Sequence, residues 1–250
     1  MRHIKIGLIL AAAAVFTTLL TAAVHADGGS SERQSIINLF KTVTPAVGAL
    51  YAQEEKGDMI FLCSATAVAR QDGQTVVLTA HHCLRKGVAY LINFGDNRYR
   101  ALTVWKIPHY EVDATKYPRR YNEPKTDMAL FLLDGEDVPI IDMAPQETIT
   151  AGMKIAMVGF PLGVAKITYE GIVAGKFDRP GSDLSGYTLL QVFGAPGSSG
   201  SAVLSVASGK VLGVMVAVTA SQVGLPVIFA TPVDYLQHLT PIQPLEKSPT

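Results

Sequence analysis

The sequence has few charged residues and no excess of either sign. Lys and Arg together number 21, as do Asp and Glu, and charged residues make up 17% of the 250 residues. This balance gives no electrostatic reason to expect nucleic acid or an anionic membrane as a partner. Hydrophobic residues make up 48%, which excludes a disordered chain and a charge-rich coiled coil.

Cysteine is also scarce. The two cysteines, Cys63 and Cys83, are too few for a small disulfide scaffold or for a four-thiolate zinc site. The chain has no internal repeat and no low-complexity segment, and it is long enough for one large domain or two small ones.

The N-terminus has the pattern of a secretory signal. Residues 1–5 include two basic residues, an apolar run follows over Ile6–Val24, and small residues lead to a cut site after Ala26. An uncut membrane anchor is the alternative, because 19 mostly apolar residues can just span a bilayer. The run is rich in alanine and threonine, and therefore weakly hydrophobic for an anchor. We expect a secreted or periplasmic protein, in a compartment where a disulfide can persist, and no membrane contact after cleavage.

The mature chain is rich in short strand patterns. A capping pattern predicts a short helix within residues 27–44, and helical periodicity returns only over Pro232–Leu239. Asp72-Gly73 and Ser208-Gly209 mark turns. The predicted strands are Met59–Ala69, Thr75–Thr79, Val88–Phe94, Met128–Leu133, Lys154–Val158, Tyr169–Lys176, Thr188–Phe193, Ala202–Val206, Val211–Val218 and Val227–Thr231. They indicate an all-β sandwich or barrel, with a surface loop at Tyr110–Lys125 and a proline-rich tail at 240–250.

Three short stretches could carry chemistry. Val77–Cys83 is a strand that ends at a histidine pair, Thr126–Leu132 has an acid leading into an apolar strand, and Ala195–Val203 is a small-residue loop entering a strand. Each alone has an ordinary explanation: a hydrogen-bonded surface histidine, a turn-capping aspartate, a flexible connection. Together they supply a hydroxyl, an imidazole and a carboxylate.

A serine hydroxyl needs these partners to become a nucleophile. An imidazole takes its proton, a carboxylate fixes the tautomer of that imidazole, and backbone N–H groups bind the developing oxyanion. His82, Asp127 and Ser199 can fill the three roles, with Gly197 and Ser199 as N–H donors.

At these residues the sequence resembles the trypsin-like serine proteases. Leu78–Cys83 resembles the family's histidine motif, in which the catalytic histidine directly precedes a cysteine, and this selects His82 over His81. Asp127–Leu130 is similar to the Asp-Ile-Ala-Leu motif of the catalytic acid, and Gly197–Ser201 matches the Gly-x-Ser-Gly-Gly/Ser pattern around the nucleophile. The resemblance implies a catalytic triad of His82, Asp127 and Ser199.

The resemblance implies further features. Phe61–Thr66 resembles the strand that carries the partner of the second cysteine, which implies a Cys63–Cys83 disulfide beside the active site. In the family, the N–H groups of the nucleophile and of the residue two before it form the oxyanion hole, here Ser199 and Gly197.

Other stretches resemble the bacterial high-temperature-requirement proteases. They are Val43–Val47, Val158–Gly163, Gly171–Ala174 and Phe229–Pro232. This implies an all-β protease domain over residues 45–239, with two antiparallel six-stranded β-barrels, the triad in the cleft between them, and short helices at both ends. Those proteases carry PDZ domains after the catalytic one, and we expect a lone catalytic domain here.

The sequence departs from the digestive members of the family. Ser198 stands where they have the aspartate that pairs with a new N-terminus, so activation of that type is not expected. Counting back six residues from the nucleophile gives Phe193, the position that often lies at the base of the family's specificity pocket. Val214, Met215 and Val216 are expected to form the strand that lines the pocket and pairs with the substrate backbone. An apolar pocket favours uncharged side chains.

Three alternatives remain open. An α/β-hydrolase needs the order Ser, acid, His, whereas only His238 follows Ser199. A metal site at His81, His82 and Cys83 is disfavoured because neighbours on an extended segment point to opposite faces. The third is a protease-like domain that binds peptides or a partner protein without cleaving. We predict an exported endopeptidase acting on polypeptides, without metal or organic cofactor and of unpredicted oligomeric state.

Overall fold

The computed structural model describes residues 31–106, 126–178, 182, 185–219 and 227–238. Residues 31–43 are helical, as the sequence predicts for this segment, and those up to Lys41 belong to a different compact unit from Thr42–Thr250. The leader, the whole Tyr110–Lys125 loop and the 240–250 tail lie outside the described residues. Among those that are described, no helix combines the length and the apolar character needed to cross a membrane.

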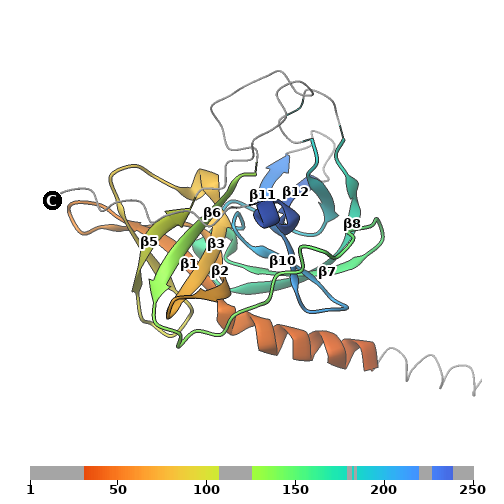
Figure 1. The fold of residues 1–250 in the computed structure, drawn as a ribbon, viewed down its shortest axis with the longest axis horizontal. Coiled ribbons are helices and arrows are strands. Elements are labelled where there is room, and N and C mark those ends of the chain that lie inside the picture. The colour runs from red at the N-terminus through yellow and green to blue at the C-terminus, as the bar shows by residue number, and fades with distance from the viewer. Residues whose placement is uncertain (1–30, 107–125, 179–181, 183–184, 220–226, 239–250) are drawn as a thin grey trace, which may run out of the picture. The chain divides into compact units, whose positions relative to one another are not determined.

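The first barrel contains six antiparallel strands, and they close in the order β1-β2-β3-β6-β5-β4 (Figure 1). The strands are β1 Val47–Gln53, β2 Met59–Gln71, β3 Gln74–Ala80, β4 Ala89–Asn93, β5 Arg100–Lys106 and β6 Met128–Asp134. Large apolar side chains fill it, among them Leu50, Leu78, Ile92 and Phe131, all fully buried. Burial of each is worth about 1.5–3 kcal/mol.

The second barrel repeats this plan with the order β10-β11-β12-β9-β8-β7. Its strands are β7 Lys154–Gly159, β8 Ile167–Lys176, β9 Thr188–Gln191, β10 Ala202–Ser205, β11 Val211–Thr219 and β12 Val227–Pro232. Its core includes Ile155, Met157, Leu190, Met215 and Ile228. The predicted fold class, two antiparallel six-stranded barrels, is confirmed.

Short 3-10 helices join or follow the strands. They are η1 Thr44–Ala46, η2 His81–Cys83, η3 Pro161–Gly163 and η4 Val233–His238, the last of which replaces the helix expected over Pro232–Leu239. The two predicted hairpin turns are present: Asp72 and Gly73 both have positive φ angles, +49° and +78°, and Gly209 has φ +71°. Consecutive positive φ angles match the twist of the strands that the turn joins.

Two strands, β1 and β5, were not expected from the sequence. The strand β1 is buried along most of its length, so its small and apolar residues show no alternation. Without alternation, a short apolar run does not by itself indicate a strand.

Candidate active site

The pairing of β3 with β6 brings a histidine and an aspartate together. Register places Ala80, the last residue of β3, opposite Met128, the first residue of β6. The residues just beyond these ends are therefore neighbours, and the N–H of His81 donates to the carbonyl of Asp127 at 3.0 Å. His82 follows in η2, 45 residues before Asp127 in sequence.

The carboxylate of Asp127 holds His82 at two points. Its Oδ1 accepts from the backbone N–H of His82 at 2.8 Å, and its Oδ2 lies 2.7 Å from Nδ1 of the ring. Because an ionised carboxylate only accepts hydrogen bonds, Nδ1 donates to it, and in the neutral imidazole the lone pair is on Nε2. A neutral imidazole held in this way can accept a proton at Nε2.

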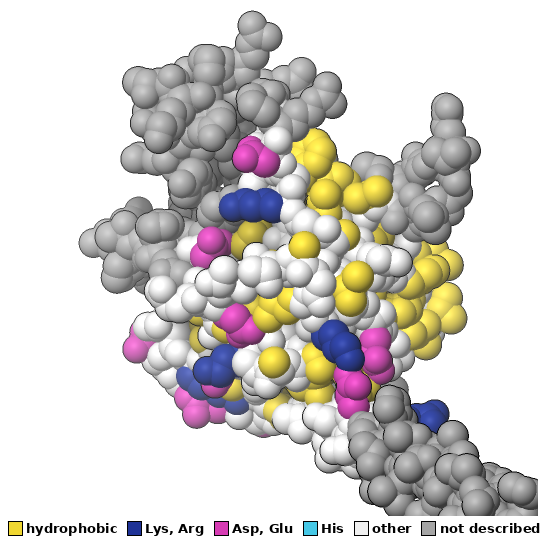
Figure 2. Space-filling view, turned by 90° about the vertical axis from the view of Figure 1, so that its right-hand side faces the viewer, with side chains coloured by type: hydrophobic (Ala, Val, Ile, Leu, Met, Phe, Trp, Pro, Cys, Tyr) yellow, Lys and Arg dark blue, Asp and Glu magenta, His cyan; other side chains and the backbone are white. Residues whose placement is uncertain are grey.

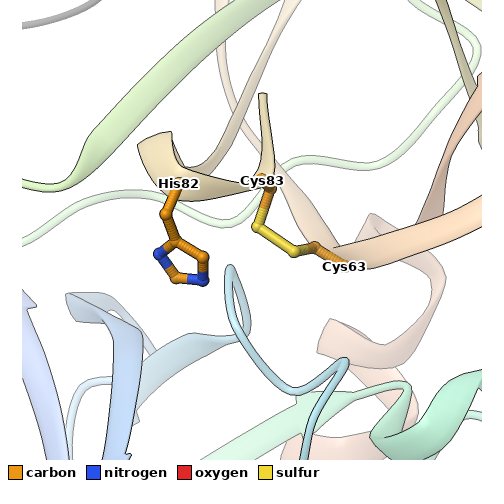
Figure 3. A group of neighbouring side chains, drawn as sticks. All are labelled: Cys63, His82 and Cys83. Carbon is orange, nitrogen blue, oxygen red and sulfur yellow. A yellow bond between two sulfur atoms is a disulfide. The ribbon is translucent and has the colours of Figure 1, made fainter. Parts of the chain in front are cut away.

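Backbone strain accompanies this contact. Asp127 has φ +39°, an unusual angle for a residue with a side chain. Such residues cost about 1–3 kcal/mol and persist where the surroundings hold them. Here the two hydrogen bonds to His82 and the one from His81 hold the residue. The imidazole is 46% exposed and points toward a light-blue loop of the second barrel (Figure 3).

A tight turn precedes the predicted nucleophile. The N–H of Ser198 donates to the carbonyl of Ala195 at 2.9 Å, with Pro196 and Gly197 between them and Gly197 at φ +90°. Proline followed by a residue of positive φ defines a type II turn. We call residues Ala195–Ser198 the Gly197 turn.

Backbone contacts fix the position of Ser199. Its carbonyl accepts from the N–H of Ser64 on β2 at 2.9 Å, and the next residue, Gly200, donates to the carbonyl of Met215 at 2.8 Å. Among the described residues, neither the Oγ of Ser199 nor the N–H groups of Gly197 and Ser199 form a hydrogen bond. These two donors are thus available to an incoming acceptor.

A disulfide lies beside the histidine. Cys63 on β2 bonds to Cys83 at the end of η2, with their Cα atoms 6.2 Å apart (Figure 3). Cys63 directly precedes Ser64, and Cys83 directly follows His82. The bond therefore ties together the segments that position Ser199 and His82, the predicted nucleophile and base.

The comparison with protein families gives a match over most of this chain. The model of the trypsin-like peptidase domain matches residues 63–214, more than half of the chain. The chain belongs to the trypsin-like peptidases. The matched range runs from the first disulfide cysteine into β11, and it includes His82, Asp127 and Ser199.

Curated relatives of this trypsin-like peptidase include two bacterial proteins described as probable periplasmic serine endoprotease DegP-like. The one from Pseudomonas fluorescens Pf-5 is 29% identical over 115 residues, which is 45% of this chain and 24% of the relative. The one from Pseudomonas putida GB-1 is 27% identical over 114 residues, with the same coverage. The chain spans about a quarter of the length of these relatives.

Solved structures share the fold. The HtrA-type protease AlgW with tripeptide has a TM-score of 0.61 at 23% identity, covering 80% of this chain and 61% of the other. The serine endoprotease from Yersinia pestis has a TM-score of 0.59 at 16% identity, covering 80% and 62%.

The four residues expected to bind substrate are not brought together on one surface. Val214 and Met215 are fully buried, because β11 pairs with β10 on one side and with β12 on the other. Val216 is also buried, at 4% exposed. Phe193 is instead 56% exposed, and its ring stacks on Tyr169 of β8 at 5.3 Å. It does not form the enclosed floor of a pocket.

The outer side of the second barrel is partly apolar (Figure 2). Exposed side chains of this barrel include Ile167, Ile172, Phe193 and Val218. Burial raises the pKa of the Tyr169 hydroxyl, so this ring stays neutral beside them. The surroundings of Phe193 therefore carry apolar and neutral aromatic groups.

One group among the described residues has the spacing of a metal site: Cys63, His82 and Cys83. Both thiols are consumed in the disulfide, so neither is available as a thiolate. Nδ1 of His82 is bonded to Asp127. These residues do not fit a bound metal, and the alternative based on His81, His82 and Cys83 gains no support.

Sequence reasoning missed Ser64. It lies inside the stretch Phe61–Thr66 that carries the resemblance, but a serine in an apolar strand gives no signal of its contacts. The structure places it, fully buried, between the two barrels.

Proposed function

We propose that this trypsin-like peptidase is an exported serine endopeptidase that cleaves polypeptides through an acyl-enzyme. The observation that carries the proposal is the pair of hydrogen bonds that His82 donates to the carboxylate of Asp127, with the imidazole facing a loop that has two unoccupied N–H donors. Membership in the peptidase family and the DegP-like relatives support it. A neighbour solved with a tripeptide supports a polypeptide substrate.

In the proposed mechanism, Oγ of Ser199 attacks the scissile carbonyl carbon while Nε2 of His82 takes its proton. Asp127 stabilises the resulting imidazolium and keeps its ring in place. The N–H groups of Gly197 and Ser199 bind the oxyanion. His82 then passes the proton to the leaving amine, and water hydrolyses the acyl-enzyme by the same steps.

Substrate preference is a separate part of the proposal. With Val214 and Met215 buried, the segment of β11 that can meet a substrate shifts to the more exposed Ala217 and Val218. These residues and Phe193 are uncharged, and we propose a preference for uncharged side chains at the cleaved position. A peptide-library profile dominated by Arg or Lys would contradict this preference.

A fluorophosphonate probe tests the enzyme against the alternative of a non-cleaving peptide-binding domain. The probe phosphorus bonds to Oγ of Ser199, fluoride leaves, and His82 accepts the proton. We expect labelling that disappears in Ser199→Ala and falls sharply in His82→Ala. Ser208→Ala, which changes an exposed serine in the turn before β11, is the matched control and should label normally. An unlabelled wild type would favour the binding domain.

The proposal that the protein is exported is supported by its leader sequence and by relatives that are described as periplasmic. Mass measurement of the protein recovered from cells tests it: a mature N-terminus at Asp27 is expected. A chain that keeps residues 1–26 in the membrane fraction would indicate the anchored alternative.

A further inference from the structure

Every polar atom of Ser64 has a hydrogen-bond partner, and its N–H and hydroxyl bond to segments of the second barrel. It is fully buried on β2. Its N–H donates to the carbonyl of Ser199 at 2.9 Å, and its own carbonyl accepts from the hydroxyl of Thr79 at 2.7 Å. Thr79 lies on β3, three residues before His82, so Ser64 joins the strand of the proposed base to the loop of the proposed nucleophile.

The hydroxyl of Ser64 has a fixed orientation. Its Oγ lies 2.9 Å from the carbonyl oxygen of Gly197 and 2.8 Å from the backbone nitrogen of Phe160. A carbonyl can only accept a hydrogen bond and an N–H can only donate one. The hydroxyl of Ser64 therefore donates its proton to the carbonyl of Gly197, and its oxygen accepts from the N–H of Phe160. The bond to Gly197 is therefore the one that the hydroxyl can donate.

This bond acts on the Gly197 turn. The carbonyl before Gly197, that of Pro196, accepts from the N–H of Leu162 at 2.6 Å, and the carbonyl of Gly197 accepts from Ser64. A trans peptide is planar, with its N–H pointing opposite to its carbonyl. Holding both carbonyls thus fixes the peptide planes on either side of Gly197, including the direction of its own N–H.

Gly197 needs such support because glycine has the widest choice of backbone angles. Loss of the Ser64 hydroxyl would leave the carbonyl of Gly197 without this partner, so that only the bond from the N–H of Ser198 to Ala195 would hold the peptide plane between Gly197 and Ser198. We propose that Ser64 is a positioning residue, whose hydroxyl holds the Gly197 turn in the orientation that donates to the oxyanion. This inference rests on the proposed function.

The test compares two buried hydroxyls on the same strand. Ser64→Ala removes the bond to Gly197. Thr66→Val removes a hydroxyl that is equally buried but has no hydrogen-bond partner in the structure, two residues further along β2. We expect Ser64→Ala to lower kcat by about 10–100-fold with KM changed less than about 3-fold, because a displaced oxyanion donor affects the transition state. Thr66→Val should retain kcat.

A second measurement reads the turn directly. Ser199 adds to the carbonyl carbon of a peptidyl trifluoromethyl ketone while His82 takes the proton, which gives a hemiketal whose oxygen sits at the N–H donors. Donors that bind the oxyanion lower the pKa of that oxygen. With a ¹³C-labelled ketone, we expect the hemiketal signal of Ser64→Ala to titrate about one pH unit higher than that of wild type or Thr66→Val.

The outcomes separate the two claims. An active wild type together with a Ser64→Ala variant of unchanged kcat and hemiketal titration overturns the role of Ser64 and leaves the proposed function intact. Equal losses in Ser64→Ala and Thr66→Val also overturn it, since they would reflect packing alone. If Ser64→Ala does not fold, Ser64→Cys, which keeps the size and a weak donor, must fold and show an intermediate kcat. A wild type that neither labels nor cleaves removes the proposed function, and this role with it.

Discussion

Replacing Gly197 by alanine should separate the cost of an unfavourable backbone angle from the cost of a displaced turn. Gly197 has φ +90°, where an alanine is strained by about 1–2 kcal/mol. A Cβ at this position would also lie 2.7 Å from the carbonyl oxygen of Phe160, 2.7 Å from a ring carbon of Phe61 and 3.1 Å from the backbone nitrogen of Leu162. Two of these three neighbours are backbone atoms, so the turn itself must move.

The movement should be costly for catalysis. Removing one oxyanion donor lowers kcat by about 10²–10³-fold, or about 2.7–4 kcal/mol, in enzymes of this mechanism. We therefore expect Gly197→Ala to lower kcat at least about 100-fold, measured with a peptide substrate and corrected for the fraction of active sites by burst titration. Unfolding in urea should show a loss of stability of at least about 1–2 kcal/mol from the backbone angle alone.

Gly57 supplies the matched control. Its φ is +85°, close to that of Gly197, but no heavy atom lies within 4 Å of a Cβ built there. Gly57→Ala should lose about 1–2 kcal/mol of stability from the backbone angle and keep its kcat. Equal kcat values for the two variants would refute the reasoning, because the contacts of the added methyl group would then have no bearing on the site.

Four further outcomes follow from the structure. Asp127→Asn should lower kcat by about 10⁴-fold with little change in fold, since an amide can stabilise the wrong tautomer of the imidazole; kinetics and circular dichroism check this. The double variant Cys63→Ser, Cys83→Ser should lose about 3 kcal/mol in urea unfolding, from a disulfide that spans 20 residues. Lys166 donates to the backbone carbonyls of Thr44 and Phe94, and burial lowers its pKa. Lys166→Met removes both bonds, although the carbonyl of Thr44 still accepts from the N–H of Val47, and should lower stability by about 1–3 kcal/mol at neutral pH in the same assay. Two neighbouring arginines hold the pKa of Asp96 well below its usual range. The ionised carboxylate therefore stabilises the fold above the unfolded-state pKa of about 4, and this contribution is lost as pH falls below that value. In Asp96→Asn, the free energy of unfolding should depend less on pH in the acid range, as followed by fluorescence.

Much of the proposed site could be predicted from short motifs, because its residues lie at strand ends. A histidine directly after β3 and an aspartate directly before β6 become neighbours once those two strands pair. The sequence therefore identified His82 and Asp127, although it could not give the register. The positive φ of Asp127 could not be predicted, because it follows from the contacts that the folded chain makes.

The exposure of the residues expected to contact substrate could not be predicted from the sequence. Val214, Met215 and Val216 form an apolar run, and such a run is equally consistent with a strand at an open edge and with one between two neighbours. The strand β11 pairs with β10 only over Val211–Val214 and with β12 over most of its length, and the side chains of Val214, Met215 and Val216 are all buried. Which strand face is open depends on pairings between distant segments, and a single sequence does not record them.

The hydrogen bonds around Gly197 explain why its N–H remains available. Buried carbonyls need partners, and those of Ala195, Pro196 and Gly197 have them within the protein. One partner comes from the turn itself, one from η3 of the second barrel, and one from Ser64 of the first barrel. With its acceptors satisfied, the turn offers donors only. One of the three partners belongs to the other barrel. A change in the packing between β2 and the Gly197 turn that is too small to disturb the fold of either barrel should therefore still alter kcat.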